Sequence, residues 1–300
     1  MKNIFTTLLI YLILATTQIF ADEIIVDGMT RTYTLFIPEN SNGKNFPLLI
    51  ALHGGGGTGE GMKKLTDFNN YADEYGFAVV YPNGFEKHWN DRREVNRKYT
   101  NGKEIDDVKF LTNLIDTLVF KYNIDSNRVF VSGISNGGAM SFYLALNAPE
   151  KFAGAAPVAI SMPTHMINDD TNVTPIPIMI IFGDEDPLVP YNGGEISIGK
   201  IKRGKVIPVN DAVDFWVKNN NCNEEPEVTY INKRMDKTKA VKYVYIPKQD
   251  GAEVVYWLIE GGGHTWPGGW QYLPKFVVGA TSREIDACEE ILKFFESVSK

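Results

Sequence analysis

A serine flanked by glycines is the residue of this chain best suited to covalent chemistry. Ser135 stands in Gly133-Ile134-Ser135-Asn136-Gly137, after an apolar, β-branched run and before a helical pattern. Between a strand and a helix, Gly-x-Ser-x-Gly is typical of a nucleophile elbow, a tight turn that lifts the serine hydroxyl clear of the sheet. Side chains at both glycine positions would collide across such a turn. The pentapeptide also occurs in ordinary loops. Whether Ser135 is a nucleophile therefore depends on finding the other catalytic groups in the chain.

A serine nucleophile needs a base, and four histidines compete for this role: His53, His88, His165 and His264. We favour His264 because it follows the last apolar strand-like run. This position gives the chain order serine, acid, histidine that accompanies a nucleophile elbow. His53 begins a glycine-rich loop, which we expect it to hold by hydrogen bonds. An ordinary loop histidine is the alternative for His264.

The histidine in turn needs a carboxylate that fixes its tautomer. The apolar run Ile176–Phe182 is followed by three acids, Asp184, Glu185 and Asp186. We favour Asp186 because the next residue, a proline, fixes the chain direction there. Asp184 remains the second candidate.

The oxyanion of an acyl-transfer intermediate requires preorganised N–H donors. The Asn136 N–H, directly after the serine, is the first candidate donor. The loop His53–Gly57 supplies the second, with Gly55 favoured over Gly56. This loop lacks the sequence of a nucleotide phosphate-binding loop, and no two histidines have the spacing of metal ligands. We therefore expect neither a cofactor nor a metal.

The elements that position these groups are predicted to alternate between strands and helices. Such alternation indicates an α/β fold with a mostly parallel central sheet and helices on both faces. Because active sites in these sheets form beyond the carboxyl ends of the strands, the candidate groups are expected to meet at one edge. The expected strands are Glu23–Val26, Arg31–Ile37, Phe46–Leu52, Phe77–Tyr81, Val129–Ser132, Ala153–Ile160, Ile176–Phe182, Val228–Ile231, Val241–Ile246 and Val254–Ile259. The expected helices are Lys63–Tyr75, Asp106–Tyr122, the segment from the elbow to Pro149, Asp211–Asn219 and Ser282–Val298, and Tyr191–Pro208 is an insertion containing glycine and lysine.

Composition narrows the functional class further. The 300 residues are 44% hydrophobic and carry a net charge of −7, which suits a globular domain and leaves no basic surface for nucleic acid. The start of the chain, Lys2 followed by the apolar run Ile4–Ala15, is typical of a secretory signal peptide ending at Ala21. The run is shorter than the roughly 20 residues of a spanning helix. We expect residues 1–21 to be removed, and residues 22–300 to form one secreted domain, extracellular or periplasmic, with no stable membrane span.

The sequence does not decide the state of the two cysteines or the role of three aromatic residues. Cys288 falls on an apolar helical stripe and is expected to be a buried thiol, but spacing alone leaves a disulfide with Cys222 open. Trp266, Trp89 and Tyr191 are candidate substrate-binding residues that would form an aromatic wall for a hydroxycinnamoyl group. The alternative is that they pack loops.

Motifs spread over most of the chain resemble the secreted esterase family of the α/β-hydrolase superfamily that includes polyhydroxybutyrate depolymerase-like and feruloyl esterase-like enzymes. The resemblance implies an α/β-hydrolase fold and the triad Ser135, Asp186 and His264. The chain departs from the family at Phe182-Gly183, at the start of the loop that carries the acid, because the family usually has a histidine before this glycine. The motifs are Leu52–Gly57, Tyr81–Gly84, Trp89-Asn90, Asp106–Val108, Ile124-Asp125, Arg128-Val129, Ser135–Gly138, Ala156–Val158, Asp186–Tyr191, Gly251–Val254 and Gly261–Gly269.

These observations predict a secreted serine esterase that hydrolyses carboxylic esters through an acyl-enzyme. The expected substrates are small-molecule or oligomeric esters of the short-chain hydroxyalkanoate or feruloyl type. A serine peptidase is the alternative within enzymes, because the same triad cleaves amides. A non-catalytic exported binding protein is the alternative outside them, because a fold does not fix function.

Overall fold

The computed structural model describes residues 22–38, 45–93, 95, 99–100, 102–167 and 173–298. The predicted signal peptide, residues 1–21, lies outside these residues. None of the helices that the structure describes is long and apolar enough to cross a membrane.

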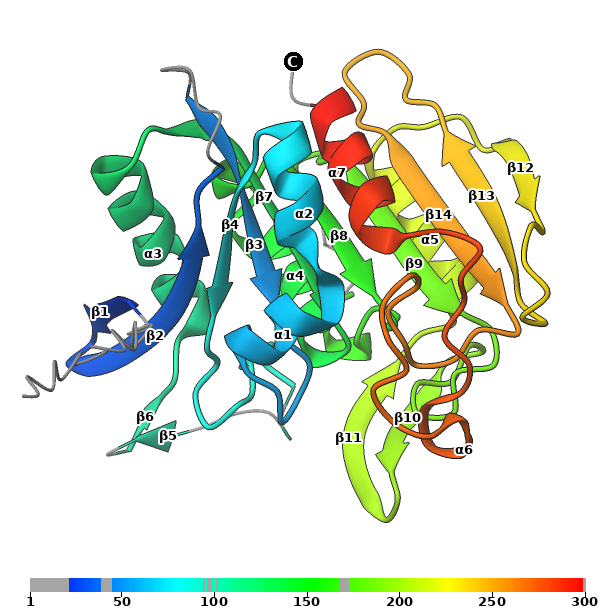
Figure 1. Ribbon diagram of the computed structural model, residues 1–300, viewed down its shortest axis with the longest axis horizontal. Helices are drawn as coiled ribbons and strands as arrows, with labels where there is room; N and C mark the ends of the chain where they lie inside the picture. Colours follow the sequence, from blue (N-terminus) through cyan, green and yellow to red (C-terminus); the bar gives the residue numbers. More distant parts are fainter. Residues whose placement is uncertain are drawn as a thin grey trace, which may run out of the picture.

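A ten-stranded sheet forms the centre of the molecule (Figure 1). Its strands are β1 (Asp22–Val26), β2 (Met29–Phe36), β3 (Phe46–Leu52), β4 (Ala78–Pro82), β7 (Ile124–Ile134), β8 (Gly154–Val158), β9 (Ile178–Gly183), β12 (Glu227–Ile231), β13 (Lys239–Tyr245) and β14 (Val254–Glu260). Their spatial order is β1-β2-β4-β3-β7-β8-β9-β14-β13-β12. The six strands from β4 to β14 pair in parallel, whereas the two strands at each edge pair antiparallel. The predicted mostly parallel sheet is confirmed.

Helices cover both faces of this sheet. They are α1 (Gly59–Thr66), α2 (Phe68–Tyr75), α3 (Asp107–Lys121), α4 (Asn136–Asn147), α5 (Val209–Asn219) and α7 (Ala287–Ser297). The four-residue α6 (Lys275–Val278) lies in the segment between β14 and α7, and short 3-10 helices occur at Pro149–Lys151 and Thr164–Met166. Figure 1 shows α1, α2 and α7 on the near face and α3, α4 and α5 behind the sheet.

The two helical layers explain why the central strands are apolar without alternation. All seven residues of β3 are buried. Successive side chains of a strand point to opposite faces, so Leu48 and Ile50 enter the core beneath α3 and α4, and Leu49 enters the core beneath α2 and α7. A strand buried on both faces needs an uninterrupted apolar run.

The structure differs from the sequence prediction in several segments. The expected helix Lys63–Tyr75 is two helices, because Asp67 adopts a left-handed backbone (φ 53°) and its N–H closes α1 on the Lys63 carbonyl. Aspartate tolerates this conformation better than most residues. The last helix begins at Ala287 rather than Ser282, because the Asp286 carboxylate caps the N–H groups of its first turn.

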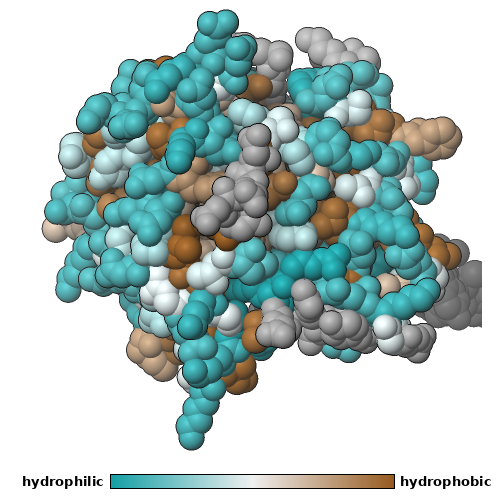
Figure 2. Space-filling view, turned by 180° about the vertical axis from the view of Figure 1, so that it is seen from behind, coloured by the Kyte–Doolittle hydropathy of each residue, from teal (hydrophilic) through white to brown (hydrophobic). Residues whose placement is uncertain are grey.

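The third difference is a hairpin inside the Tyr191–Pro208 insertion. It consists of β10 (Gly194–Ile198) and β11 (Ile201–Val206), paired antiparallel. A second small hairpin pairs β5 (Tyr99–Thr100) with β6 (Lys103–Glu104). The β10–β11 hairpin projects beyond the carboxyl ends of the parallel strands (Figure 1). Seen from behind in Figure 2, the same place at the lower edge is a mostly hydrophilic projection. This hairpin therefore overhangs the edge where the site is expected.

Candidate active site

Ser135 stands at a strained turn between β7 and α4. Its backbone has φ 57° and ψ −116°, a conformation that a residue with a side chain rarely adopts. The Ser135 N–H donates to the Val158 carbonyl at 2.9 Å, which ties the turn to β8. A Cβ atom on Gly133 would lie 2.6 Å from the Gly137 carbonyl carbon, and one on Gly137 would lie 2.4 Å from the Leu52 oxygen. Both glycines are therefore required sterically, as the sequence predicts.

His264 and Asp186 form a buried pair. His264 Nδ1 lies 2.7 Å from Asp186 Oδ2, and both side chains are almost fully buried. The other carboxylate oxygen accepts the N–H groups of Leu188 and Val189, each at 2.8 Å. Because an ionised carboxylate only accepts hydrogen bonds, Nδ1 carries the imidazole proton and Nε2 is left as the acceptor. The Tyr272 hydroxyl donates to the His264 carbonyl at 2.7 Å and fixes the backbone of the histidine.

Asp184, the second candidate acid, has a different position. Its carboxylate is exposed and accepts the Gly261 N–H at 2.7 Å, at the start of the loop that carries His264. It thus supports this loop through the backbone, while Asp186 alone of the two contacts the imidazole. The geometry favours the preferred choice, Asp186.

Ser135 and His264 line one cavity of about 640 Å³. This volume is within the usual range for a small-molecule site. Within the described residues, no hydrogen bond joins the two side chains; a hydrogen bond between a serine and its general base often forms with good geometry only when substrate binds. Most of the remaining wall is apolar and includes Ile134, Ile160, Met62, Leu65, Leu188, Ile196, Ile198, Trp270 and Leu273.

The glycine-rich loop lies against the elbow. A Cβ atom on Gly54 would be 3.6 Å from the Ser135 Cβ, and one on Gly55 would be 3.7 Å from the Asn136 Cβ. Within the described residues, the N–H groups of Gly55 and Asn136 have no hydrogen-bond acceptor, whereas the Gly56 N–H donates to the Lys87 carbonyl at 2.8 Å. This difference favours Gly55 over Gly56 as the second N–H donor.

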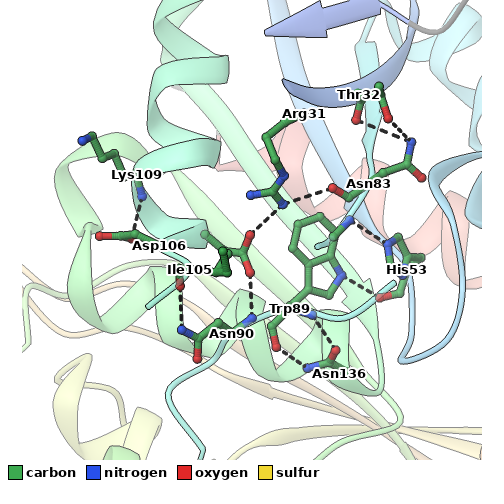
Figure 3. Close-up of polar contacts among 12 residues, drawn as sticks. Arg31, Thr32, His53, Asn83, Trp89, Asn90, Ile105, Asp106, Lys109 and Asn136 are labelled. Atoms are coloured by element: carbon green, nitrogen blue, oxygen red, sulfur yellow. Dashed lines mark hydrogen bonds and ion pairs between the residues drawn. The ribbon is translucent and has the colours of Figure 1, made fainter. Parts of the chain in front are cut away.

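A buried polar network holds the glycine-rich loop and the elbow together (Figure 3). The Asn136 side chain contacts the Trp89 backbone twice, accepting its N–H at 2.8 Å and donating to its carbonyl at 3.1 Å. The Trp89 indole N–H donates to the His53 carbonyl at 2.8 Å. Beyond it, Asp107 accepts the Asn90 N–H and pairs with Arg31, each at 2.7 Å. The sequence prediction gave Asn136 only a backbone role, because its side-chain partner lies 47 residues earlier in the chain.

The three predicted substrate-binding aromatic residues do not line the cavity. Trp89 is buried in the network described above, and Trp266 is fully buried, with its indole N–H 3.3 Å from Cys288 Sγ. The Tyr191 hydroxyl contacts Asn210, and its ring packs on Phe182. For these residues the alternative, loop packing, fits the structure. The correction has a simple cause, because a place in a loop at the strand ends does not give the direction of a side chain.

Aromatic residues that do line the cavity come from the loop after Gly269. Trp270 and Tyr272 both face the site, and the Trp270 side chain is about half exposed at 53%. In the sequence, Trp270 and Tyr272 could be identified as candidate cavity residues only by their position in the strand-end loop that also carries His264. Cys222 and Cys288 are both free thiols, so the disulfide left open by the sequence is absent.

His53 holds the glycine-rich loop as a neutral imidazole. The Gly84 N–H donates to Nε2 at 3.0 Å, so Nδ1 carries the proton and donates to the Gly54 carbonyl at 2.8 Å. Burial, the largest cause, lowers the His53 pKa from 6.5 to about 4. The hydrogen-bonding role predicted for this residue is confirmed.

This depressed pKa predicts a pH dependence of stability. Between pH 6.5 and 4 the unfolded chain protonates His53 and the folded chain does not. The stabilisation from burying the neutral ring is therefore complete above pH 6.5 and is lost as the pH falls toward 4. Between pH 7 and 4.5 we expect His53→Gln to lose about 2 kcal/mol less free energy of unfolding than the wild type. Urea titrations at both pH values measure this, and equal losses would contradict it.

The fold and this strand-end site define an α/β-hydrolase. Residues 36–203, more than half of the chain, match the family described as Phospholipase/Carboxylesterase. The chain is 32% identical over 286 residues to a putative esterase, NocK, from Nocardia uniformis subsp. tsuyamanensis, covering 91% of this chain and 81% of that protein. The chain therefore belongs to the Phospholipase/Carboxylesterase family and is a carboxylic ester hydrolase.

Two further relatives support this assignment, and one solved structure shares the fold. Feruloyl esterase B of Piromyces equi is 29% identical over 58% of this chain, and acetylxylan esterase A of Emericella nidulans is 27% identical over 47%. The chain spans only 32% and 45% of these two proteins. The structure of an acetyl xylan esterase from Aspergillus awamori matches with a TM-score of 0.58 at 17% identity, covering 88% of this chain and 93% of that one, which shows the shared fold.

Proposed function

We propose that the protein is a serine esterase whose triad is Ser135, His264 and Asp186. The observation that carries this proposal is the 2.7 Å contact between His264 Nδ1 and Asp186 Oδ2, together with the strained Ser135, which lines the same cavity as His264. A carboxylate on Nδ1 leaves Nε2 free to take the serine proton. The unpaired N–H groups of Gly55 and Asn136 are proposed to bind the oxyanion.

The reaction follows from these positions. Ser135 Oγ attacks the ester carbonyl while His264 Nε2 takes the hydroxyl proton, and the carbonyl oxygen becomes the oxyanion. The bond to the alcohol then breaks, and His264 gives the proton to the leaving oxygen. Water repeats the sequence on the acyl-enzyme and releases the acid, with His264 again acting first as base and then as acid.

The proposed substrates are small or oligomeric esters of the feruloyl, acetyl or short hydroxyalkanoate type. The similarity to feruloyl and acetylxylan esterases supports the first two, and the apolar cavity wall accommodates an aryl or short alkyl acyl group. We also propose that residues 1–21 direct export and that residues 22–300 form the catalytic domain. N-terminal sequencing of exported protein, expected to begin at Asp22, checks this division.

A panel of acyl groups on one chromogenic alcohol tests the activity. We expect acetyl, butyryl, feruloyl and hydroxybutyryl 4-nitrophenyl esters to be hydrolysed, with at least one kcat/KM above about 10⁴ M⁻¹s⁻¹. The anilide matching the best ester should react at least about 10³-fold more slowly. An anilide cleaved as fast as its ester would instead indicate a peptidase, and a protein inactive on every ester would refute the proposal.

A further inference from the structure

The charged residues that line the cavity containing Ser135 are arginines, although the chain as a whole is acidic. Among the described residues that line it are two arginines, Arg93 and Arg203, and no aspartate or glutamate. The net charge of the chain is −7. The local charge of a site, rather than the net charge, determines which ligand it attracts at short range.

The two arginines differ in how their charge is balanced. Arg93 is buried and its guanidinium pairs with Asp91 Oδ2, at 2.6 Å from Nη2 and 2.8 Å from Nε. Arg203 is only half-buried, and within the described residues no carboxylate lies at ion-pair distance from it. Among the described residues, the positive charge of the cavity that no carboxylate balances is therefore that of Arg203.

Arg203 lies on a strand whose backbone is fixed. Arg93 Nη1 donates to the Arg203 carbonyl at 3.2 Å. The next residue, Gly204, has φ 88°, and a Cβ atom there would lie 3.2 Å from Arg93 Cδ, so the arginine stem packs on this glycine. At the base of the hairpin, directly after β11, the Ile207 N–H donates to the Met162 carbonyl at 3.0 Å. Arg93, which is paired with Asp91, therefore anchors the strand that carries Arg203.

The register of the hairpin places Arg203 toward the cavity. Glu195 pairs with Lys205 and Ser197 with Lys202, so Ile196 lies opposite both Arg203 and Gly204. Ile196 is buried and lines the cavity. Residues opposite one another in an antiparallel pair share a face of the hairpin, so Arg203 shares the cavity-facing side with Ile196.

We propose that Arg203 binds a carboxylate of the substrate and makes the enzyme selective for esters that carry an anionic group near the scissile bond. This inference rests on the proposed esterase activity at Ser135. The planar guanidinium can donate two parallel N–H bonds to a carboxylate. Because the half-buried Arg203 has already lost part of its hydration, binding a carboxylate requires less further desolvation than it would for a fully exposed arginine. The apolar wall around it would hold the uncharged part of the same substrate.

Two pairs of esters test the selectivity at either end of the substrate. The mono-4-nitrophenyl ester of glutaric acid and 4-nitrophenyl pentanoate differ by a carboxylate on the acyl group. The compounds 4-acetoxybenzoate and methyl 4-acetoxybenzoate differ by a carboxylate on the leaving group. For at least one pair, Arg203→Gln should lower the anionic-to-neutral ratio of kcat/KM about tenfold or more, the effect expected for one charge-assisted pair.

Lys205→Gln is the matched control because it removes one positive charge from the same strand. Lys205 is exposed and does not line the cavity, so both ratios should stay within about twofold of the wild type at 0.15 M salt. The thermal midpoint of Arg203→Gln, expected to equal that of the wild type, shows that the variant is folded. Unchanged ratios for Arg203→Gln in both pairs, or equal falls for both variants, would overturn the inference. A wild type inactive on all four esters would refute the esterase proposal itself.

Discussion

Replacing Ser135 by alanine is expected to lower kcat/KM for 4-nitrophenyl acetate by about 10⁴-fold or more. The substitution removes one oxygen atom and keeps the Cβ atom, so the strained turn and the N–H of Asn136 stay in place. Binding and oxyanion stabilisation then persist, but no acyl-enzyme forms. Steady-state kinetics measure the loss, and thermal unfolding checks that the variant folds.

Ser197→Ala provides the matched control for this experiment. Ser197 lies on β10 with an exposed side chain and does not line the cavity. Its removal should change kcat/KM by less than about twofold, as for most exposed positions. A Ser135→Ala variant that retains more than a tenth of the wild-type activity would exclude Ser135 as the nucleophile.

Replacing Asp186 by asparagine has the second largest expected effect, a fall in kcat of about 10⁴-fold. The Leu188 and Val189 N–H groups need an acceptor at Oδ1, so the new amide must turn its NH₂ group toward His264. An NH₂ group donates to Nδ1 and places the imidazole proton on Nε2. In that tautomer His264 cannot accept the Ser135 proton.

Asp184→Asn separates this tautomer effect from a general loss of loop structure. Asparagine can still accept the Gly261 N–H through its side-chain oxygen, so we expect kcat to fall less than about tenfold. Assays of both variants at neutral pH make the comparison. Similar losses for the two variants would contradict the assignment of Asp186 as the triad acid.

The fold, and the meeting of the candidate groups at one edge of the sheet, can be predicted from the sequence for physical reasons. A parallel strand buried on both faces, such as β3, must be apolar throughout, and this pattern is visible without a structure. The glycines at 133 and 137 follow from the tight turn around Ser135. Strand-end loops of one parallel sheet converge on one edge, so Ser135, Asp186 and His264 could be brought together from their chain positions alone.

The remaining features depend on directions and long-range contacts that no local pattern contains. Gly56 differs from Gly55 only because its N–H meets the Lys87 carbonyl. Trp266 turns into the core whereas Trp270, four residues later, faces the cavity. The periodicity of Lys63–Tyr75 continues through Asp67, so the break between α1 and α2 was not predicted.

The place of Arg203 in the cavity wall cannot be predicted from the sequence for a related reason. The Tyr191–Pro208 insertion shows no apolar periodicity strong enough to identify the hairpin, and its lysines give it the composition of a solvated loop. Its relation to the site arises from the contact between Arg93 and the Arg203 carbonyl, 110 residues apart in the chain. Such a contact can be identified only once the hairpin is placed over the sheet.

Mass spectrometry of the protein after reaction with a fluorophosphonate tests the central claim most directly, because this reagent phosphonylates only an activated serine. We expect one adduct per chain, located by peptide mapping on Ser135, no adduct on Ser135→Ala, and slow labelling of His264→Ala, which lacks the base. An adduct on another residue, equal labelling of Ser135→Ala, or no adduct on a protein that hydrolyses esters would contradict the assignment of Ser135 as the nucleophile.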